Sequence, residues 1–230
     1  MSITLFSLKL QNTSWEDLRA ALDVARKKEE NLRITTVNPE YLLEAKHNKR
    51  FFESLRKADI RLIDGVGICL LAMLQGVRLQ RLTGADVLPL MLTWAEKEGL
   101  PVAIYNSEQG LSSQSDIEMM LHAKYPNLHF DYNLQPTTYG LILCTYGAPT
   151  QEFLLDILET PAIKMGIGGA LDFLIGTQVR APYLLRLLGL EWLWRLLRQP
   201  RRINRIWRAV VVFPLQGIME ISKEKYGRKI

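Results

Sequence analysis

The sequence predicts an α/β fold in which a mostly parallel sheet carries helices on both faces. Short apolar or β-branched segments alternate with longer helix-like segments along most of the chain. This alternation is typical of βαβ units, because two parallel strands need a crossover connection that is usually a helix. The segment at 140–144 is apolar throughout, as expected for a strand that is buried on both faces of such a sheet.

The predicted elements before Asp64 follow from turn and capping residues. Ser14 is a favoured N-cap residue for the helix that follows it. Asn38-Pro39 ends a β-branched strand, because the residue before a proline is disfavoured in helical geometry, and Pro39 is a favoured first residue of the next helix. The elements are therefore a short strand or hairpin over 1–12, helices over 15–29, 39–46 and 49–58, and strands over 33–37 and 60–63.

The chain after Asp64 continues the alternation. Gly65 and Gly67 lead into an apolar helix-like segment, and Gly99-Leu100-Pro101 separates a later helix from the next strand. We predict helices over 87–97 and 113–123 and one ending near 158, a turn over 107–110, and strands over 102–105, 128–132, 140–144 and 163–167.

The composition is that of a soluble protein with one large core, at 48% apolar and 23% charged residues over 230 positions. Cys69 and Cys144 have apolar neighbours and no CxxC or Cys/His spacing. A disulfide framework or a zinc site is therefore not expected, and a reducing cytosolic setting fits. The first residues have neither a basic leader nor a small-residue cleavage site, and we expect no signal peptide.

Positive charge is concentrated between Arg180 and Arg208. This segment has eight arginines and one glutamate, a net charge of +7, whereas the remainder has 21 basic and 23 acidic residues, a net charge of −2. The pI near 9.2 therefore reports a local feature, and it indicates an anionic partner for the C-terminal fifth of the chain. The change in composition predicts a core domain at 1–179 and a C-terminal appendage at 180–230.

The basic segment also contains many leucines and several tryptophans. Charged residues interrupt its apolar runs, so it cannot form a spanning helix, which needs about 20 apolar residues. Leu, Trp and Tyr beside arginine are typical of a helix that lies in the headgroup plane of a membrane, where each cation contributes on the order of 1 kcal/mol. A core-packing helix with a basic outer face explains the pattern equally well. Nucleic-acid binding is less favoured, because the sequence contains no recognisable nucleic-acid module.

Several polar residues fall at predicted strand-to-helix turns. Ligands of open α/β sheets bind beyond the carboxyl ends of the strands, so we expect these side chains to share one edge, with Asp64 as a candidate base. Each also has a purely structural interpretation, as a turn, cap or surface residue. The residues are Thr36, Asn38, Asp64, Thr83 and Gln151, with Arg81 nearby in the sequence.

Several common chemistries lack their motifs. The chain has no GxxxxGK[ST] loop, no complete GxGxxG, no HExxH and no metal-like spacing of its three histidines. An Asp-x-Asp pair that could hold a divalent ion on a diphosphate is also missing. A phosphate-bearing substrate would then need protein cations or backbone N–H groups.

A series of short motifs between about residues 30 and 214 resembles the motifs of the WecG/TagA/CpsF glycosyltransferases and follows the same order along the chain. Four short segments are similar to the family's T-x-N, DGxG, R-x-T-G-x-D and G-x-P-K-Q-E: Thr36-Val37-Asn38, Asp64-Gly65-Val66-Gly67, Arg81-Leu82-Thr83-Gly84-Ala85-Asp86 and Gly147-Ala148-Pro149-Thr150-Gln151-Glu152. The next family block is resembled by residues 168–182. The family's C-terminal appendage is resembled by residues 191–197 with Pro200, Arg202 and Arg205.

The resemblance implies a Rossmann-like core and an inverting, metal-independent transferase without a cofactor. It implies transfer of a hexose-type sugar (N-acetylmannosamine-like, its uronic acid, or glucose) from a UDP-sugar to a polyprenyl-diphosphate-linked sugar, in the synthesis of a cell-surface polysaccharide or teichoic acid. The appendage would touch the membrane and help complete the site, which implies a peripheral location on the cytoplasmic face of the plasma membrane. No nucleic-acid partner is implied, and a homo-oligomer stays open.

The resemblance also implies roles for single residues. Asp64 is the expected general base, with Thr36 beside it as a second catalytic residue. The base would take the proton of the acceptor hydroxyl as that oxygen attacks the anomeric carbon from the face opposite UDP. Substrate-binding roles fall to Asn38, Arg81, Thr83, Asp86, Gln151, Glu152, Arg195, Arg202 and Arg205, of which the last three would face the diphosphate of the leaving group. Membrane contacts fall to Trp192, Trp194, Arg198, Arg201 and Trp207, and no metal ligand is expected.

The sequence departs from the family pattern at positions expected near the donor. Thr150 stands in place of a lysine, Thr145 and Tyr146 replace part of a glycine-containing turn, and 105–107 replace a glycine-rich turn. A glycine-aromatic segment after the strand at 128–132 is missing. The identity of the donor sugar, and a lost or altered activity, therefore stay open. The competing interpretation is a non-catalytic Rossmann-like protein that binds a membrane surface or nucleic acid through its basic tail.

Overall fold

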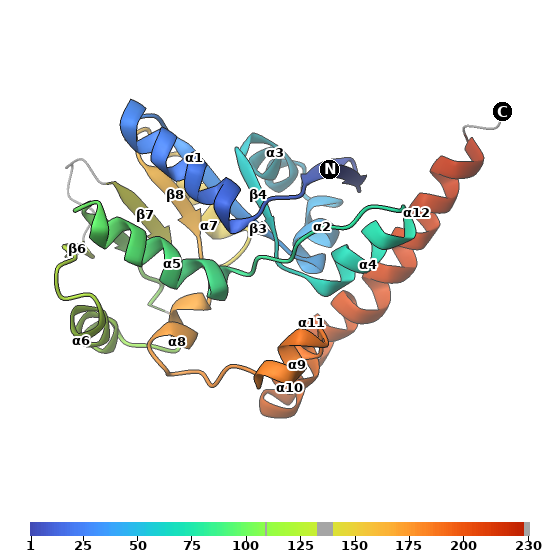
Figure 1. Ribbon diagram of the computed structural model, residues 1–230. Helices are drawn as coiled ribbons and strands as arrows, with labels where there is room; N and C mark the ends of the chain where they lie inside the picture. Colours follow the sequence, from blue (N-terminus) through green and yellow to red (C-terminus); the bar gives the residue numbers. More distant parts are fainter. Residues whose placement is uncertain (109, 133–139, 228–230) are drawn as a thin grey trace.

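A six-stranded parallel sheet forms the centre of the protein (Figure 1). The structure is a computed structural model that describes residues 1–108, 110–132 and 140–227. Strand order across the sheet is β4-β3-β8-β7-β5-β6. The strands are β3 (Leu32–Val37), β4 (Ile60–Ile63), β5 (Val102–Tyr105), β6 (Phe130–Asp131), β7 (Leu141–Cys144) and β8 (Ile163–Gly166).

Helices cover both faces of this sheet, and each face has its own apolar core. In β7, Leu141 and Leu143 belong to the cluster beneath one face, whereas Ile142 and Cys144 pack on the other. The first face carries α1 (Trp15–Lys28), α5 (Gly84–Lys97), α6 (Gln114–Lys124) and α8 (Ala170–Leu174). The second carries α2 (Pro39–Ala45), α3 (Lys49–Lys57), α4 (Val66–Leu74) and α7 (Thr150–Asp156). The predicted fold class is thus confirmed.

Up to β8, the differences from the predicted elements lie mainly at their ends, whereas the short helix α8 was not predicted. Helix α5 begins at Gly84 instead of 87, because the Thr83 side chain accepts a hydrogen bond from the Asp86 N–H and caps the helix there. Strand β6 is two residues long, where five were predicted. The segment that follows it at 133–139, and Gln109 in the predicted turn, lie outside the described residues.

The N-terminal hairpin forms a separate two-stranded sheet that packs beside β4 and against the C-terminal helix. Strands β1 (Ser2–Leu5) and β2 (Leu8–Gln11) pair antiparallel. The Phe6 N–H donates to Glu220 Oε1 at 2.6 Å, and the Phe6 ring lies 5.7 Å from that of Phe213. Phe213 is fully buried in the core cluster that the hairpin shares with α2, α3 and α4. The start of helix α12 (Phe213–Gly227) is therefore part of the folded core.

The basic segment forms several short helices in place of the single interfacial helix that the pattern predicted. These are α9 (Tyr183–Leu187), α10 (Glu191–Arg198), a 3-10 turn at Pro200–Arg202, α11 (Ile203–Trp207) and a π-helical turn at Arg208–Val212 that continues into α12. Gly189, with a φ of +73°, and Pro200 mark the first two interruptions. In the described part of the chain, none of the helices has the length and apolar character that crossing a membrane requires.

Candidate active site

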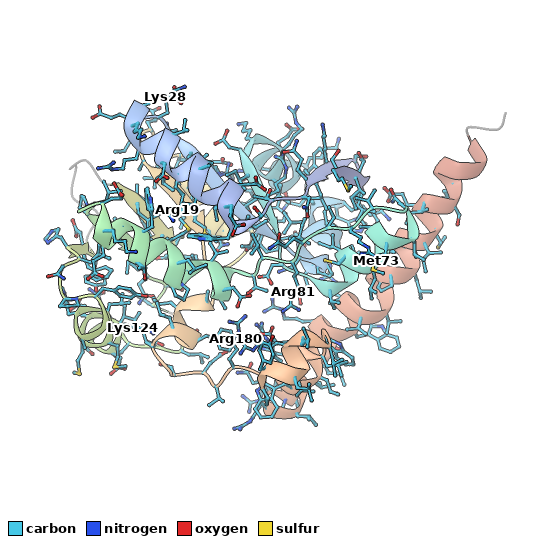
Figure 2. The ribbon with its side chains drawn as sticks, in the orientation of Figure 1. Arg19, Lys28, Met73, Arg81, Lys124 and Arg180 are labelled. Atoms are coloured by element: carbon cyan, nitrogen blue, oxygen red, sulfur yellow. The ribbon has the colours of Figure 1, made fainter. Side chains whose placement is uncertain are left out.

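Two pockets meet at the carboxyl ends of the sheet strands. The first has a volume of about 390 Å³ and lies under the loops after β5, β7 and β8. The second, of about 200 Å³, lies between the first turns of α2 and α4 and the helices α10 and α11. Figure 2 shows Arg81 and Arg180 where the sheet domain meets the C-terminal helices. Five predicted site residues line both pockets: Asn38, Asp64, Arg195, Arg202 and Arg205.

Asp64 occupies the boundary between the pockets. It follows β4, and its own N–H donates to the Val37 carbonyl at 2.8 Å, which fixes the residue beside the end of β3. Burial raises the pKa of the Asp64 carboxyl from 3.8 to about 6. Arg195, the Gly84 N–H at 3.4 Å and Arg81 favour the ionised form, while Glu191 opposes it. The carboxylate is thus ionised at neutral pH, yet basic enough to take a proton.

This pKa predicts how the rate should depend on pH. Because the base acts only when ionised, kcat/KM should fall about tenfold per pH unit below pH ~6 and level off above pH ~7. Initial rates measured between about pH 4.5 and 8, with circular dichroism to confirm that the protein stays folded, test this. A profile that remains flat to about pH 4.5 would contradict a base with a raised pKa.

The glycine after Asp64 is required by packing. A Cβ at Gly65 would lie 2.5 Å from Pro39 Cδ, so the turn after β4 can approach the start of α2 only without a side chain. Asn38 caps that same helix, since its Oδ1 accepts the Tyr41 N–H at 3.0 Å. The structural interpretation of Asn38 as a cap is therefore confirmed. The cap engages the Asn38 carbonyl oxygen and not its amide nitrogen, and the residue lines both pockets.

Gln151 joins the loops that form the floor of the first pocket. Its Oε1 accepts the N–H groups of Gly147 at 3.1 Å and Gly168 at 3.0 Å. Its Nε2 donates to the Tyr41 hydroxyl at 2.7 Å and to Glu152 at 2.9 Å. All of its hydrogen-bonding groups are engaged and the side chain is buried. Gln151 therefore lies at the pocket, as predicted. Its observed hydrogen bonds hold two backbone loops in position, whereas the predicted role was contact with a sugar.

Glu152 lines neither pocket, in contrast to its predicted place in substrate binding. It is buried beneath Tyr41 and accepts a hydrogen bond from that hydroxyl at 3.0 Å. Burial raises the pKa of the Glu152 carboxyl, although hydrogen bonds from Gln151 and Tyr41 oppose the shift. Its place in the structure is behind Gln151 and Tyr41, whose side chains it orients.

Asp86 and Thr83 hold the chain that leads to the appendage. Arg180 Nη1 lies 2.7 Å from Asp86 Oδ1, and its Nη2 donates to Thr83 Oγ1 at 3.1 Å. Burial favours the neutral acid, but hydrogen bonds from Arg180 and Thr83 outweigh it and lower the pKa of Asp86. Thr83 and its predicted neighbour Thr36 still line the first pocket, whereas Asp86 lines neither pocket.

Three arginines of the appendage, Arg195, Arg202 and Arg205, line both pockets where these meet. Arg195 donates to Glu191 at 2.9 Å, and Arg205 donates to Glu40 at 2.9 and 2.5 Å. Arg81 lines the second pocket, with its Nη2 3.7 Å from Glu191. Within the described ranges, Arg202 alone of the four arginines that line the second pocket has no ion pair.

The surroundings of Arg202 favour an anion. Burial lowers the pKa of its guanidinium, and the charges of Arg205 and Arg195 lower it further. Since two positive neighbours and partial desolvation both disfavour the charge, a phosphate oxygen bound here would relieve an unfavourable arrangement. The site therefore brings together a carboxylate of raised pKa, polar side chains and an arginine suited to an anion.

The predicted membrane residues divide into two groups. Trp192 lines the second pocket, and Trp194 donates to the Val179 carbonyl at 3.3 Å with Arg198 stacked on its ring. Arg198, Arg201 and Trp207 are exposed. The exposed apolar side chains of α9 were missed by sequence reasoning, although their leucine-rich spacing was readable: Tyr183, Leu184, Leu187 and Leu188.

Other site residues carried no sequence signal of their own. Glu40 and Glu191 pair with arginines far away in the sequence, and Tyr41 supports Gln151 from another strand-helix unit. Arg180 was identified as the start of the basic segment and as part of the family-like block at 168–182, but its partners Asp86 and Thr83 were not predicted. No group of three or more His, Cys, Asp and Glu side chains in the described ranges is arranged to hold a metal ion.

Comparison with known proteins places this geometry in context. A family model described as "Glycosyl transferase WecG/TagA/CpsF family" matches residues 3–227. A protein of Bacillus subtilis (strain 168), named N-acetylglucosaminyldiphosphoundecaprenol N-acetyl-beta-D-mannosaminyltransferase, is 27% identical over 210 residues. The similarity covers 84% of this chain and 80% of that protein. The matched range includes Asp64, both pockets and the C-terminal arginines.

Proposed function

The chain belongs to the WecG/TagA/CpsF glycosyltransferase family, and from that premise we propose the reaction that this glycosyltransferase performs. It transfers a hexose-type sugar from a UDP-sugar to a polyprenyl-diphosphate-linked sugar, with inversion and without a metal ion. The name of the B. subtilis relative includes such a lipid diphosphate and N-acetylmannosamine. This name favours an N-acetylmannosamine-like donor sugar over its uronic acid or glucose. The observation that carries the proposal is the basic carboxylate of Asp64 between two pockets that share three arginines.

We place the donor in the first pocket and the acceptor in the second. The first is larger and lined mostly by polar loop residues after β5, β7 and β8, which suits a sugar nucleotide at the carboxyl edge of the sheet. The second combines arginines with apolar side chains, among them Val66, Trp192 and Ile206. Such a mixture suits a molecule with an anionic diphosphate and an apolar chain. In this arrangement each substrate reaches Asp64 from its own side.

The mechanism follows from this placement. Asp64 takes the proton of the acceptor hydroxyl, and the oxygen forms a bond to the anomeric carbon as the bond from that carbon to the UDP oxygen breaks. The electron pair of the broken bond stays on UDP. Arg195 and Arg202, which line both pockets, neutralise the charge that develops there. The Asn38 amide and the Thr36 hydroxyl hold the sugars, and the glycoside forms on the face opposite UDP.

The exposed surface of the appendage supports a peripheral membrane location. Exposed Trp207, the exposed arginines Arg198 and Arg201, and the apolar face of α9 suit the headgroup region of an anionic leaflet. We propose that the protein works on the cytoplasmic face of the plasma membrane, where UDP-sugars and polyprenyl-diphosphate acceptors meet, in the synthesis of a surface polysaccharide or teichoic acid.

A screen of UDP-sugars tests the proposal. Purified protein is incubated with each UDP-sugar and a polyprenyl-diphosphate-linked N-acetylglucosamine, with and without EDTA. We expect UDP release and a longer glycan with one or a few donors, unchanged by the chelator. Binding to vesicles or nucleic acid without transfer from any donor would instead support the non-catalytic interpretation. Transfer that EDTA abolishes would reject the metal-independent mechanism.

Arg202→Ala should be among the most damaging changes in the appendage. It removes a half-buried cation that lines both pockets, and loss of one such contact commonly costs about 3–4 kcal/mol, or 10²–10³ in kcat. Arg208→Ala is the matched control, because Arg208 is exposed and lines neither pocket. Rates on a water-soluble acceptor separate catalysis from membrane binding. Equal rates for the two variants would leave Arg202 without a catalytic role.

A further inference from the structure

Helix α4 has an exposed apolar stripe that the proposed reaction leaves unused. Leu70, Met73 and Leu74 are between 56% and 65% exposed. Their i, i+3, i+4 spacing places them on one face of the helix. The opposite face, with Leu71 and Ala72, is buried in the core. Three large apolar side chains that share one exposed face are more than the isolated exposed residues of an ordinary surface.

Helix α12 repeats the pattern and packs against α4. Leu215, Ile218 and Met219 have the same i, i+3, i+4 spacing and are also exposed. The two helices lie side by side (Figure 1), and Met73 lies beside α12 (Figure 2). A Cβ at Gly217 would fall 2.2 Å from Leu71, so the glycine lets the two backbones approach closely. The six exposed residues lie on these two neighbouring helices, outside their contact, and we call them the α4–α12 surface.

The α4–α12 surface is continuous with the second pocket. Val66, in the first turn of α4, lines the pocket, and Leu70 and Leu74 follow it at i+4 and i+8. The stripe therefore runs about 12 Å outward from the pocket, at about 1.5 Å per residue. Ala209 and Val210 line the same pocket just before α12 begins. Helix α4 thus starts at the pocket, and α12 begins shortly after the segment that lines it.

The charges along this path are arranged for an amphiphile. The pocket end carries Arg81, Arg195, Arg202 and Arg205 together with Asp64, Glu40 and Glu191, and Arg202 has no ion pair with these carboxylates. No acidic residue occurs between Asp64 and Asp86, a stretch that includes all of α4. A molecule with a diphosphate at one end and an apolar chain at the other would meet cations first and exposed apolar side chains afterwards.

We propose that the α4–α12 surface binds the part of the acceptor's isoprenoid chain that follows its diphosphate. This inference rests on the proposed function, because it needs an acceptor whose diphosphate lies in the second pocket. A bilayer surface or a second copy of the chain could also cover exposed apolar residues. Neither accounts for a stripe that begins inside the pocket, at Val66, next to the diphosphate-binding arginines.

Two acceptors and one double variant test the proposal. The acceptors carry the same sugar and diphosphate, one as a farnesyl ester and the other as a methyl ester. The double variant Leu70→Gln/Met73→Gln makes the stripe polar. Because glutamine is a good helix former and both positions are exposed, the variant should still fold. Met119→Gln/Met120→Gln on the distant α6 is the control, because both methionines are exposed and line neither pocket.

We expect KM for the farnesyl acceptor to rise about tenfold in the α4 variant, with kcat unchanged. KM for the methyl acceptor should not change, because only an acceptor with an apolar chain can bury the apolar area that the variant loses. The control should match the wild type. Equal KM values for the farnesyl acceptor in variant and wild type overturn the proposal. An equal rise in KM for both acceptors would also overturn the proposal. A variant that loses only vesicle binding, or only self-association, would overturn it as well. Absence of transfer to either acceptor in the wild-type protein would reject the proposed function itself.

Discussion

Asp64→Asn should lower kcat by about 10²–10⁴-fold and at the same time stabilise the folded protein at neutral pH. The loss of rate follows from removal of the base. The gain in stability follows from burial, because the folded state raises the pKa of the carboxyl from 3.8 to about 6 and so penalises its ionised form. Such a shift corresponds to roughly 3 kcal/mol at most, and asparagine has no charge to desolvate.

The pH dependence of this gain gives a second test. The raised pKa means that the acid form of Asp64 adds stability at low pH, and that this contribution is lost as the pH rises through about 6. Urea unfolding of wild type and variant should therefore differ at pH ~8 and differ little near pH ~4. Near-wild-type turnover would remove Asp64 as the base. A stability difference that is the same at both pH values would remove the buried charge as its cause.

Phe213→Ala should destabilise the protein by about 3–5 kcal/mol, the usual cost of deleting a buried aromatic ring. Phe213 is fully buried, packs on Phe6 of the hairpin and lies against Gly67 of α4. The cavity would open where the N-terminal hairpin, α4 and α12 meet, and these elements cannot close it without moving the arginine-bearing segment that precedes α12.

Urea or thermal unfolding of Phe213→Ala and Leu215→Ala makes a matched comparison. Leu215 is on the same helix and is exposed, so its replacement should change stability by no more than about 0.5 kcal/mol. A Phe213 variant within about 1 kcal/mol of wild type would mean that α12 is not part of the core. The predicted boundary near residue 180 stays a prediction. Truncation there would remove Phe213, so a loss of activity in such a protein would not isolate the arginines.

The sheet and one edge of the site could be predicted because their signals are local. Thr36 lies near the end of β3, and Asn38 and Asp64 directly follow β3 and β4, whose ends are marked by proline or glycine. Parallel strands bring such ends to one edge. The start of α5 was also readable, since Thr83 followed three residues later by Asp86 is a capping pattern. The sequence prediction placed that start three residues late because it weighed the apolar spacing over the cap.

The partners of the polar side chains could not be predicted, because they depend on how distant units pack. Glu40 meets Arg205, and Gln151 joins the loops of two strands to Tyr41, only once the order of the strands is set. The local sequence around a helical glutamate does not indicate which distant arginine it will pair with. The burial of Gln151 and Glu152 could not be predicted for the same reason, and their contacts with substrate stay predictions.

The contact between the hairpin and α12 has a consequence for how the chain reaches its fold during synthesis. The Phe6 N–H and Glu220 are 214 residues apart in the sequence, and Phe213 fills the core beneath the first two strands. The ribosome releases the hairpin first, and α2, α3 and α4 can cover part of its apolar side, but Phe6 cannot meet Phe213 until the last helix has emerged. Contacts of such long range form late and slow the search for the native state. The nascent protein therefore completes this core only at the end of its translation, just after the segment that contributes Ala209 and Val210 to the second pocket.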